Sequence, residues 1–98
     1  MNHWLHEEAE AELGEAAVYY AEHASRSIAE AFLVEFSRVI ALLETNQRLG
    51  ARKEAEMRAY PFHRFPYSLV YRESDSDGPQ VYAVAHQSRE PGYWQGRV

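Results

Sequence analysis

Residues 57–72 read MRAYPFHRFPYSLVYR, and the alternation at the end of this stretch decides the fold. From Tyr67 to Tyr71, large apolar or aromatic side chains occupy every second position, which predicts a half-buried strand. A preceding strand is predicted over residues 57–62, where Pro61 confines it to a sheet edge or ends it early. The turn between the two strands is expected at residues 63–66. The stretch therefore predicts an antiparallel pair of strands.

The sequence on the C-terminal side continues this sheet. Residues 74–79 read SDSDGP, a combination of residues that favours a turn. Residues 81–86 read VYAVAH, and their alternation predicts a further strand. A short edge strand is expected at residues 3–5, and residues 87–98 follow the last strand as a tail.

The N-terminal half of the chain has a helical period instead. Between residues 5 and 24, alanines and leucines recur at steps of three and four, which places them on one stripe of a helix. A second helix is expected to begin at Ser25 or Ser27, and Ser27 and Glu30 have the spacing of a capping box. This helix is expected to end near Glu44. Its broad apolar face favours contacts with both the first helix and the sheet.

These elements predict one α+β domain over residues 1–98, with an N-terminal helical hairpin packed on one face of a small antiparallel sheet. A hydrophobic fraction of 46% and a charged fraction of 26% argue against a disordered chain. The absence of cysteine excludes a disulfide framework. No apolar run approaches the roughly 18 residues of a membrane span, and no basic-then-apolar leader opens the chain, so we expect a cytoplasmic protein without membrane association.

The charge is divided unevenly along the chain. The net charge of −5 argues against a general nucleic-acid binder, which needs a basic surface. Residues 1–47 carry nine carboxylates against two arginines, whereas residues 48–98 carry eight cations against six carboxylates. The resulting charges of −7 and +2 suggest an acidic hairpin and an arginine-bearing sheet with its tail.

The tail holds the residues that are best suited to acid–base chemistry or to binding a phosphate. A predicted strand ends at His86, Arg89 follows, and Tyr93 and Trp94 come after a Pro-Gly turn. A histidine can act as an acid or a base near neutral pH, and an arginine can hold a phosphate. In the structural interpretation, His86 hydrogen-bonds at the strand end, Arg89 pairs with a carboxylate, and the two aromatic residues form a lid over the core.

Three further arginines fall on or between the predicted strands, namely Arg58, Arg64 and Arg72. If they share a face with Arg89, they form a basic patch that can bind phosphates or an acidic peptide. The alternative is that each one pairs separately with a carboxylate.

No motif for a metal or a cofactor is present. His3 and His6 flank Trp4 near the chain end, but they lack the helical ligand spacing of a metal site on a rigid element. The sequence has no phosphate-cradling glycine loop, no nucleophile elbow and no zincin pair. We therefore expect neither a metal nor a cofactor.

The ordered set of segments resembles the RelE/ParE superfamily, the toxins of bacterial type II toxin–antitoxin systems. The resemblance runs through residues 8–13 (EAEAEL), 19–21 (YYA), 32–43, 49–50 (LG), Arg58, 65–71 (FPYSLVY), 84–89 (VAHQSR) and 93–94 (YW). It implies a short first strand, a helical hairpin and an antiparallel sheet. It also implies a cognate antitoxin as partner.

The RelE-like branch of this superfamily consists of ribosome-dependent mRNA endonucleases. Such members have two lysines before the Phe-Pro-Tyr turn, an arginine after its tyrosine and a cation after the last strand. The aligned residues here are Ala59, Pro61, Ser68 and Gln87, and only the terminal tyrosine is matched, by Tyr93. Each missing cation weakens transition-state stabilisation by roughly 2–4 kcal/mol. The acidic charge of the chain also fits poorly with docking onto ribosomal RNA.

Two alternatives remain open at this point. One is a divergent ribonuclease acting on ribosome-bound mRNA, and the other is a non-toxic binding module with the same fold. The roles assigned to the ribonuclease are a general acid (His86), base stacking or proton transfer (Tyr93), a general base (Glu54 or Glu56) and phosphate binding (Arg64 and Arg89).

ParE-like members have the same fold without the nuclease residues, and their family target is DNA gyrase. A late strand that ends in His86, with Arg89 three residues on, is common to such sequences. The tail is then a protein-binding element in which Tyr93 and Trp94 are suitable anchors. The leading interpretation is a ParE-like toxin that inhibits bacterial growth by binding a protein target such as DNA gyrase, without nuclease chemistry. An antitoxin whose C-terminal segment wraps the hairpin is expected to neutralise it.

Overall fold

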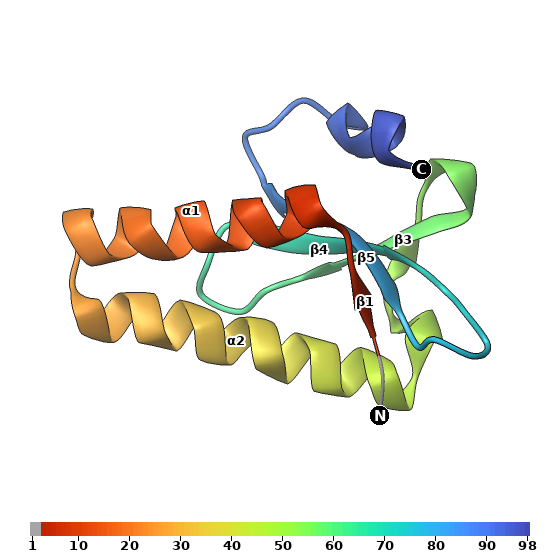
Figure 1. Cartoon of the computed structure of the whole chain (residues 1–98), viewed down its shortest axis with the longest axis horizontal. Helices are drawn as coiled ribbons and strands as arrows, with labels where there is room; N and C mark the ends of the chain where they lie inside the picture. Colours follow the sequence, from red (N-terminus) through yellow and green to blue (C-terminus); the bar gives the residue numbers. More distant parts are fainter. Residues whose placement is uncertain (1–2) are drawn as a thin grey trace.

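The structure, a computed structural model, describes residues 3–98. Two long helices lie beside a twisted sheet, and the C-terminal tail folds back near the start of the first helix (Figure 1). The elements in chain order are β1 (Trp4–Leu5), α1 (Glu7–His23), α2 (Arg26–Thr45), η1 (Gln47–Leu49), β2 (Ala51–Arg52), η2 (Glu54–Glu56), β3 (Met57–Pro61), β4 (Tyr67–Arg72), β5 (Gln80–His86) and η3 (Tyr93–Arg97).

The five strands form one sheet in the order β1-β5-β4-β3-β2. The predicted strands β3, β4 and β5 are antiparallel neighbours, and β2 adds antiparallel to β3. The predicted edge strand β1 joins β5 in parallel, so the sheet is mixed. A strand that leads into a helix rather than into a tight turn is free to run parallel to its neighbour. The α+β class with a helical hairpin on a small sheet is confirmed.

The helical hairpin forms where the sequence predicts it, and the structure uses the first of the two candidate N-caps of the second helix. Ser25 is the N-cap of α2, and its hydroxyl accepts a hydrogen bond from the backbone N–H of Ile28 at 3.1 Å. The predicted capping box of Ser27 and Glu30 is therefore wrong, because the helix has already begun at Arg26. Within residues 3–98, no helix combines the length and the apolar character that crossing a membrane requires.

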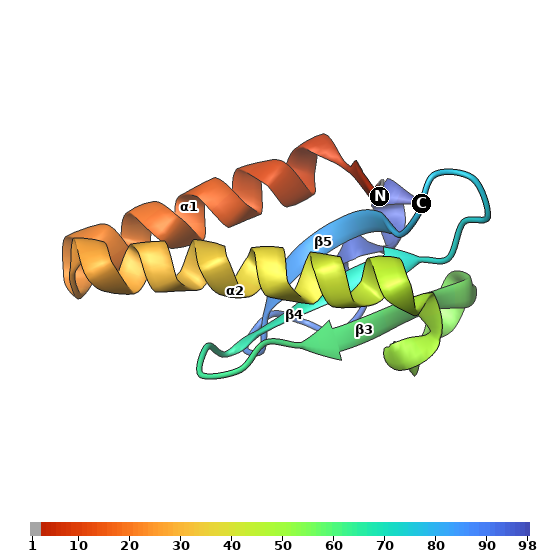
Figure 2. The ribbon, with the colours of Figure 1, turned by 90° about the horizontal axis from the view of Figure 1, so that it is seen from below.

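The main core lies between the hairpin and one face of the sheet. Figure 2 shows both helices on the same side of the strands. Phe32 and Leu43 of α2 and Leu69 and Tyr71 of β4 are fully buried in it. Each such side chain contributes about 1.5–3 kcal/mol through apolar burial, so this layer dominates the stability of the fold.

A buried carboxylate ties α2 to the turn between β3 and β4. Glu35 accepts two hydrogen bonds from the Arg38 guanidinium, each 2.8 Å long, and one from the backbone N–H of His63 at 2.6 Å. The Arg38 hydrogen bonds outweigh the effect of burial and hold the pKa of Glu35 below its usual value. The turn predicted at residues 63–66 is thus fixed to the hairpin.

The tail covers the opposite face of the sheet. Trp94 is only 5% exposed and packs with Met57, Val70 and Ala83, which point away from the hairpin. Gly92 begins the final turn with a φ of 78°, a left-handed conformation that glycine adopts without strain. The interpretation of the tail aromatics as a lid over the core is therefore confirmed for Trp94.

Candidate functional site

The arginines predicted from the sequence divide into two groups. Arg58 and Arg72 line one hollow of about 340 Å³ together with Arg48 and Arg52, and this space is called the arginine hollow below. Arg64 and Arg89 do not line it. Arg48 and Arg52 could not be predicted as part of this hollow, because η1 and the two-residue strand β2 have no alternating pattern that predicts their place.

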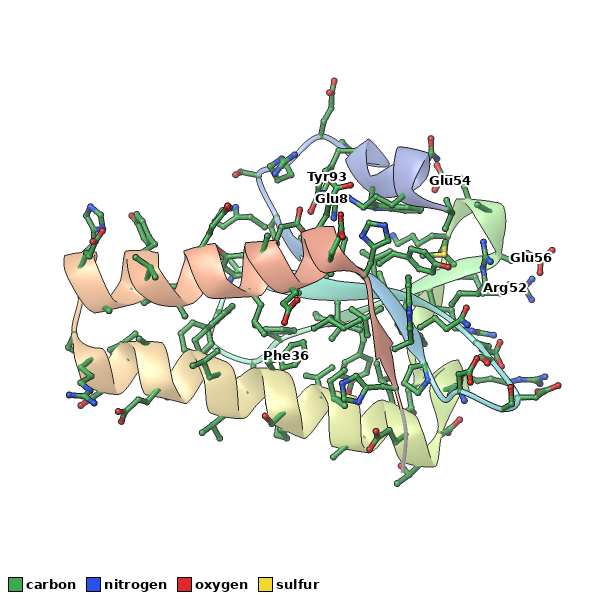
Figure 3. All side chains as sticks on the ribbon, in the orientation of Figure 1. Glu8, Phe36, Arg52, Glu54, Glu56 and Tyr93 are labelled. Atoms are coloured by element: carbon green, nitrogen blue, oxygen red, sulfur yellow. The ribbon has the colours of Figure 1, made fainter. Side chains whose placement is uncertain are left out.

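The sheet register brings these side chains to one end of the strands. Arg52 pairs directly with Arg58 across β2 and β3, and Met57 pairs with Arg72 across β3 and β4. Figure 3 shows Arg52 and Glu56 on the same side of the molecule, far from the connection between the helices. Four arginines from three strands and η1 therefore contribute to the lining of one space.

A buried tyrosine fixes the chain that carries β2. The Tyr71 hydroxyl donates to the carbonyl oxygen of Gln47 at 2.6 Å and accepts from the backbone N–H of Gly50 at 2.9 Å. A Cβ atom at Gly50 would lie 2.6 Å from the Tyr71 hydroxyl oxygen, so only glycine fits there. The backbone of residues 47–50, which leads into β2 beside the hollow, is consequently held in one conformation.

Arg58 and Arg48 share one internal carboxylate. The Nε atoms of Arg58 and Arg48 each lie 3.2 Å from an oxygen of Glu73. Burial alone would raise the pKa of Glu73, but these arginines lower it. Arg58 also donates to the carbonyl oxygens of Gly50 at 2.9 Å and Arg48 at 3.3 Å. Arg58 thus pairs with a carboxylate, as the structural interpretation expected.

The other two arginines of the hollow have no such partner. Among residues 3–98, no carboxylate lies within ion-pair distance of Arg52 or Arg72. The Arg72 guanidinium lies 5.5 Å from the centre of the Tyr82 ring, and the Arg52 side chain is exposed. Four arginines face two glutamates, Glu56 and Glu73, so the lining carries excess positive charge.

The tail is locked to α1 by Glu12. Its two carboxylate oxygens accept hydrogen bonds from two nitrogens of Arg97, each at 2.9 Å, and from the Tyr93 hydroxyl at 2.8 Å. One oxygen also accepts the backbone N–H of Val84 at 3.0 Å. Arg97 further donates to the carbonyl oxygen of Tyr82 at 3.0 Å. This network supplies hydrogen-bond partners for two backbone groups of β5 past the end of β1, namely the N–H of Val84 and the carbonyl oxygen of Tyr82.

The network also sets the ionisation of its members. Burial alone would raise the pKa of Glu12, but the hydrogen bonds from Arg97, Tyr93 and Val84 outweigh it and lower that pKa. Burial raises the pKa of Tyr93 strongly, and the hydrogen bond to Glu12 raises it further. The Tyr93 hydroxyl is therefore held protonated and is committed to a structural hydrogen bond.

His86 lies at the end of β5, as predicted. Its Nδ1 accepts the backbone N–H of Ser88 at 3.0 Å, and its ring meets that of Tyr67 edge-on at 5.0 Å. It lines a hollow of about 210 Å³ that Arg89 also lines. The Arg89 guanidinium stacks on the Tyr93 ring, 3.8 Å from its centre.

The remaining residues assigned to a ribonuclease lie apart from this hollow. The Arg64 guanidinium is 5.5 Å from the centre of the Phe65 ring, Glu54 lines a hollow near Trp94, and Glu56 lines the arginine hollow. Arg89 lines one hollow with His86 and stacks on Tyr93, whereas Arg64 and both glutamates lie elsewhere. Within residues 3–98, no group of three metal-ligating side chains is arranged to hold a metal ion.

Comparison with known proteins identifies one family. The model of the ParE toxin of type II toxin–antitoxin systems, parDE, matches residues 5–91. A solved structure of the chromosomal ParDE toxin–antitoxin system from P. aeruginosa contains a chain that is 19% identical, with a TM-score of 0.74. The match covers 88% of this chain and 95% of that chain. At this identity the likeness shows the fold alone. No curated protein matches the sequence.

Proposed function

Because the chain belongs to the ParE toxin family of type II toxin–antitoxin systems, we propose that it inhibits growth by binding DNA gyrase without bond-making chemistry. The observation that carries this proposal is the state of the sheet face beneath the tail. Ala59, at a position where RelE-like members have a lysine, packs there against the cluster that contains Trp94. An apolar, covered face supports a binding protein over a nuclease that needs exposed cations around a phosphate.

The tail supports the same proposal. The Tyr93 hydroxyl donates to Glu12, and the Tyr93 ring carries Arg89 on its face. Both groups are therefore engaged in holding the tail in place. Arg89 remains at the surface, where an arginine stacked on an aromatic ring is a suitable contact for a protein partner.

The family implies an antitoxin as partner, and we propose that the antitoxin's C-terminal segment folds across the hairpin. The outer surface of the two helices offers apolar side chains for this purpose. Val18 and Tyr19 of α1 are each 55% exposed, and Leu33 and Val34 of α2 are 41% and 68% exposed. Neutralisation by such contacts requires both proteins in one compartment, which agrees with the proposed cytoplasmic location.

The test is expression of the chain in a bacterium, alone and together with the antitoxin gene expected beside it. We expect growth arrest in the first case and rescue in the second. Purified chain should inhibit supercoiling by gyrase and leave mRNA intact in a translating extract. Cleavage of mRNA that is abolished by His86→Ala or Tyr93→Phe would instead establish a ribonuclease. The absence of any growth defect would favour a non-toxic binding module.

A further inference from the structure

The arginine hollow carries more positive charge than the fold uses. It is lined by Arg48, Arg52, Arg58 and Arg72, and within residues 3–98 its lining includes two carboxylates, those of Glu56 and Glu73. Glu73 already serves both Arg48 and Arg58. Arg52 and Arg72 have no carboxylate of residues 3–98 within ion-pair distance. Arg52 and Arg72 therefore line the hollow without an ion-pair partner among residues 3–98.

The sheet register makes this arrangement unfavourable for the isolated chain. Arg52 and Arg58 are directly opposite each other across β2 and β3. Like charges in such a cross-strand pair destabilise a sheet. A neutral side chain at position 52 would remove that repulsion, and no ion pair of residues 3–98 would be lost with it. Local conflicts of this kind are expected at binding sites.

The hollow is also prepared for a ligand before one arrives. Arg58 is held by Glu73 and by the carbonyl oxygens of Gly50 and Arg48, and its side chain is only 14% exposed. Arg72 is steadied by the ring of Tyr82. Because these side chains lose little freedom on binding, the entropic cost of capturing an anion is reduced. The planar fork of arginine matches a carboxylate with two parallel hydrogen bonds.

We propose that this hollow binds neighbouring carboxylates of a short acidic segment from a protein partner. A space of about 340 Å³ accommodates one or two acidic side chains. An extended nucleic acid needs a continuous basic track, and Arg64 and Arg89 do not line the hollow. The net charge of −5 further opposes a long polyanion. The assignment concerns only this pocket and does not depend on gyrase being the cellular target.

The test is a titration of the purified full chain with a capped eight-residue peptide that has two adjacent glutamates in a glycine-serine background. The isosteric glutamine peptide is the ligand control. We expect the glutamate peptide to shift the side-chain N–H resonances of Arg52 and Arg72, and the glutamine peptide to leave them in place. Arg52→Gln and Arg72→Gln should each weaken binding about tenfold, the loss expected for one charged hydrogen-bonded contact.

Arg26→Gln is the matched control, because Arg26 is an exposed arginine at the start of α2 and does not line the hollow. It should bind the peptide as the parent does. A cooperative unfolding transition with a midpoint no lower than that of the parent shows that each variant keeps the fold, and Arg52→Gln is the decisive variant if Arg72→Gln does not fold. Equal binding of the two peptides, or unaltered affinity in Arg52→Gln, would overturn the proposal. Tighter binding of inorganic phosphate or of a short DNA oligonucleotide at the same resonances would overturn the choice of an acidic peptide.

Discussion

Two regions on either side of Tyr82, the tail network and the arginine hollow, differ in how their arginines are paired. At the tail, Arg97 is 10% exposed and meets Glu12 through two hydrogen bonds of 2.9 Å. In the arginine hollow, Arg52 and Arg72 have no ion-pair partner among residues 3–98. In the tail network the charged groups pair with each other, whereas Arg52 and Arg72 of the arginine hollow stay unpaired within residues 3–98. The difference separates a residue that stabilises the domain from residues that are available to a partner.

The largest loss of stability is expected from breaking the tail network. Glu12→Ala leaves Arg97, Tyr93 and the backbone N–H of Val84 without their common acceptor. Because Arg97 and Glu12 are both nearly buried, removing one partner should lower the free energy of unfolding by about 3 kcal/mol. Urea denaturation measures this loss.

The matched control for that prediction is Glu8→Ala. Glu8 also lies within 3.5 Å of Arg97, but its side chain is 60% exposed. An exposed ion pair of this kind contributes about 0–1 kcal/mol, so the control should unfold close to the parent. If Glu12→Ala behaved like Glu8→Ala, the tail would not be held by this network.

Acid should reproduce part of the same loss. Glu12 and Glu35 have lowered pKa values in the folded state, so the unfolded chain binds protons more readily. Their contribution is complete above the ordinary glutamate pKa of about 4.3 and falls as the pH drops below it. We expect the urea midpoint to fall from about pH 5 toward pH 3, and to fall less steeply in Glu12→Ala. Parallel curves for parent and variant would contradict a lowered pKa at Glu12.

A smaller loss of stability is expected from a substitution in the segment of residues 47–50 that leads into β2. Gly50→Ala would place a Cβ atom 2.6 Å from the Tyr71 hydroxyl oxygen and 3.0 Å from the carbonyl oxygen of Ala59. Overpacking at such a site should lower the free energy of unfolding by about 2 kcal/mol. Gly14→Ala is the control, since a Cβ atom there meets nothing within 4 Å, and it should raise stability by about 0.5–1 kcal/mol. Equal unfolding midpoints for the two variants would show that the Tyr71 contact yields easily.

The difference between the two regions also explains what the sequence could predict. Periodicity located both helices and the strands β3, β4 and β5, because each has a pattern long enough to read. The alternation also placed Arg58 and Arg72 on neighbouring strands. It missed Arg48 and Arg52, which lie on η1 and on a two-residue strand.

The tail network could not be predicted, because its partners are remote along the chain. Glu12 is separated from Tyr93 by 81 residues and from Arg97 by 85 residues. In the sequence, Glu12 is one of nine carboxylates in the acidic half, and nothing local distinguishes it. Only the packing of α1 beside β5 brings these groups together. Local patterns therefore predicted the elements, whereas the fully paired charges required the tertiary structure.

The smallest expected effect tests the hollow itself. Arg52→Gln removes the like-charge pair with Arg58, so the free energy of unfolding should rise by about 0.2–0.5 kcal/mol. Urea denaturation at low ionic strength measures the gain, which should shrink in about 1 M salt because screening weakens the repulsion. Arg26→Gln, which loses only its exposed pair with Glu30, should not gain stability. A loss of more than about 1 kcal/mol in Arg52→Gln would mean that Arg52 is built into the fold as Arg97 is, since exposed substitutions rarely have such effects. The distinction between the tail network and the arginine hollow would then fail.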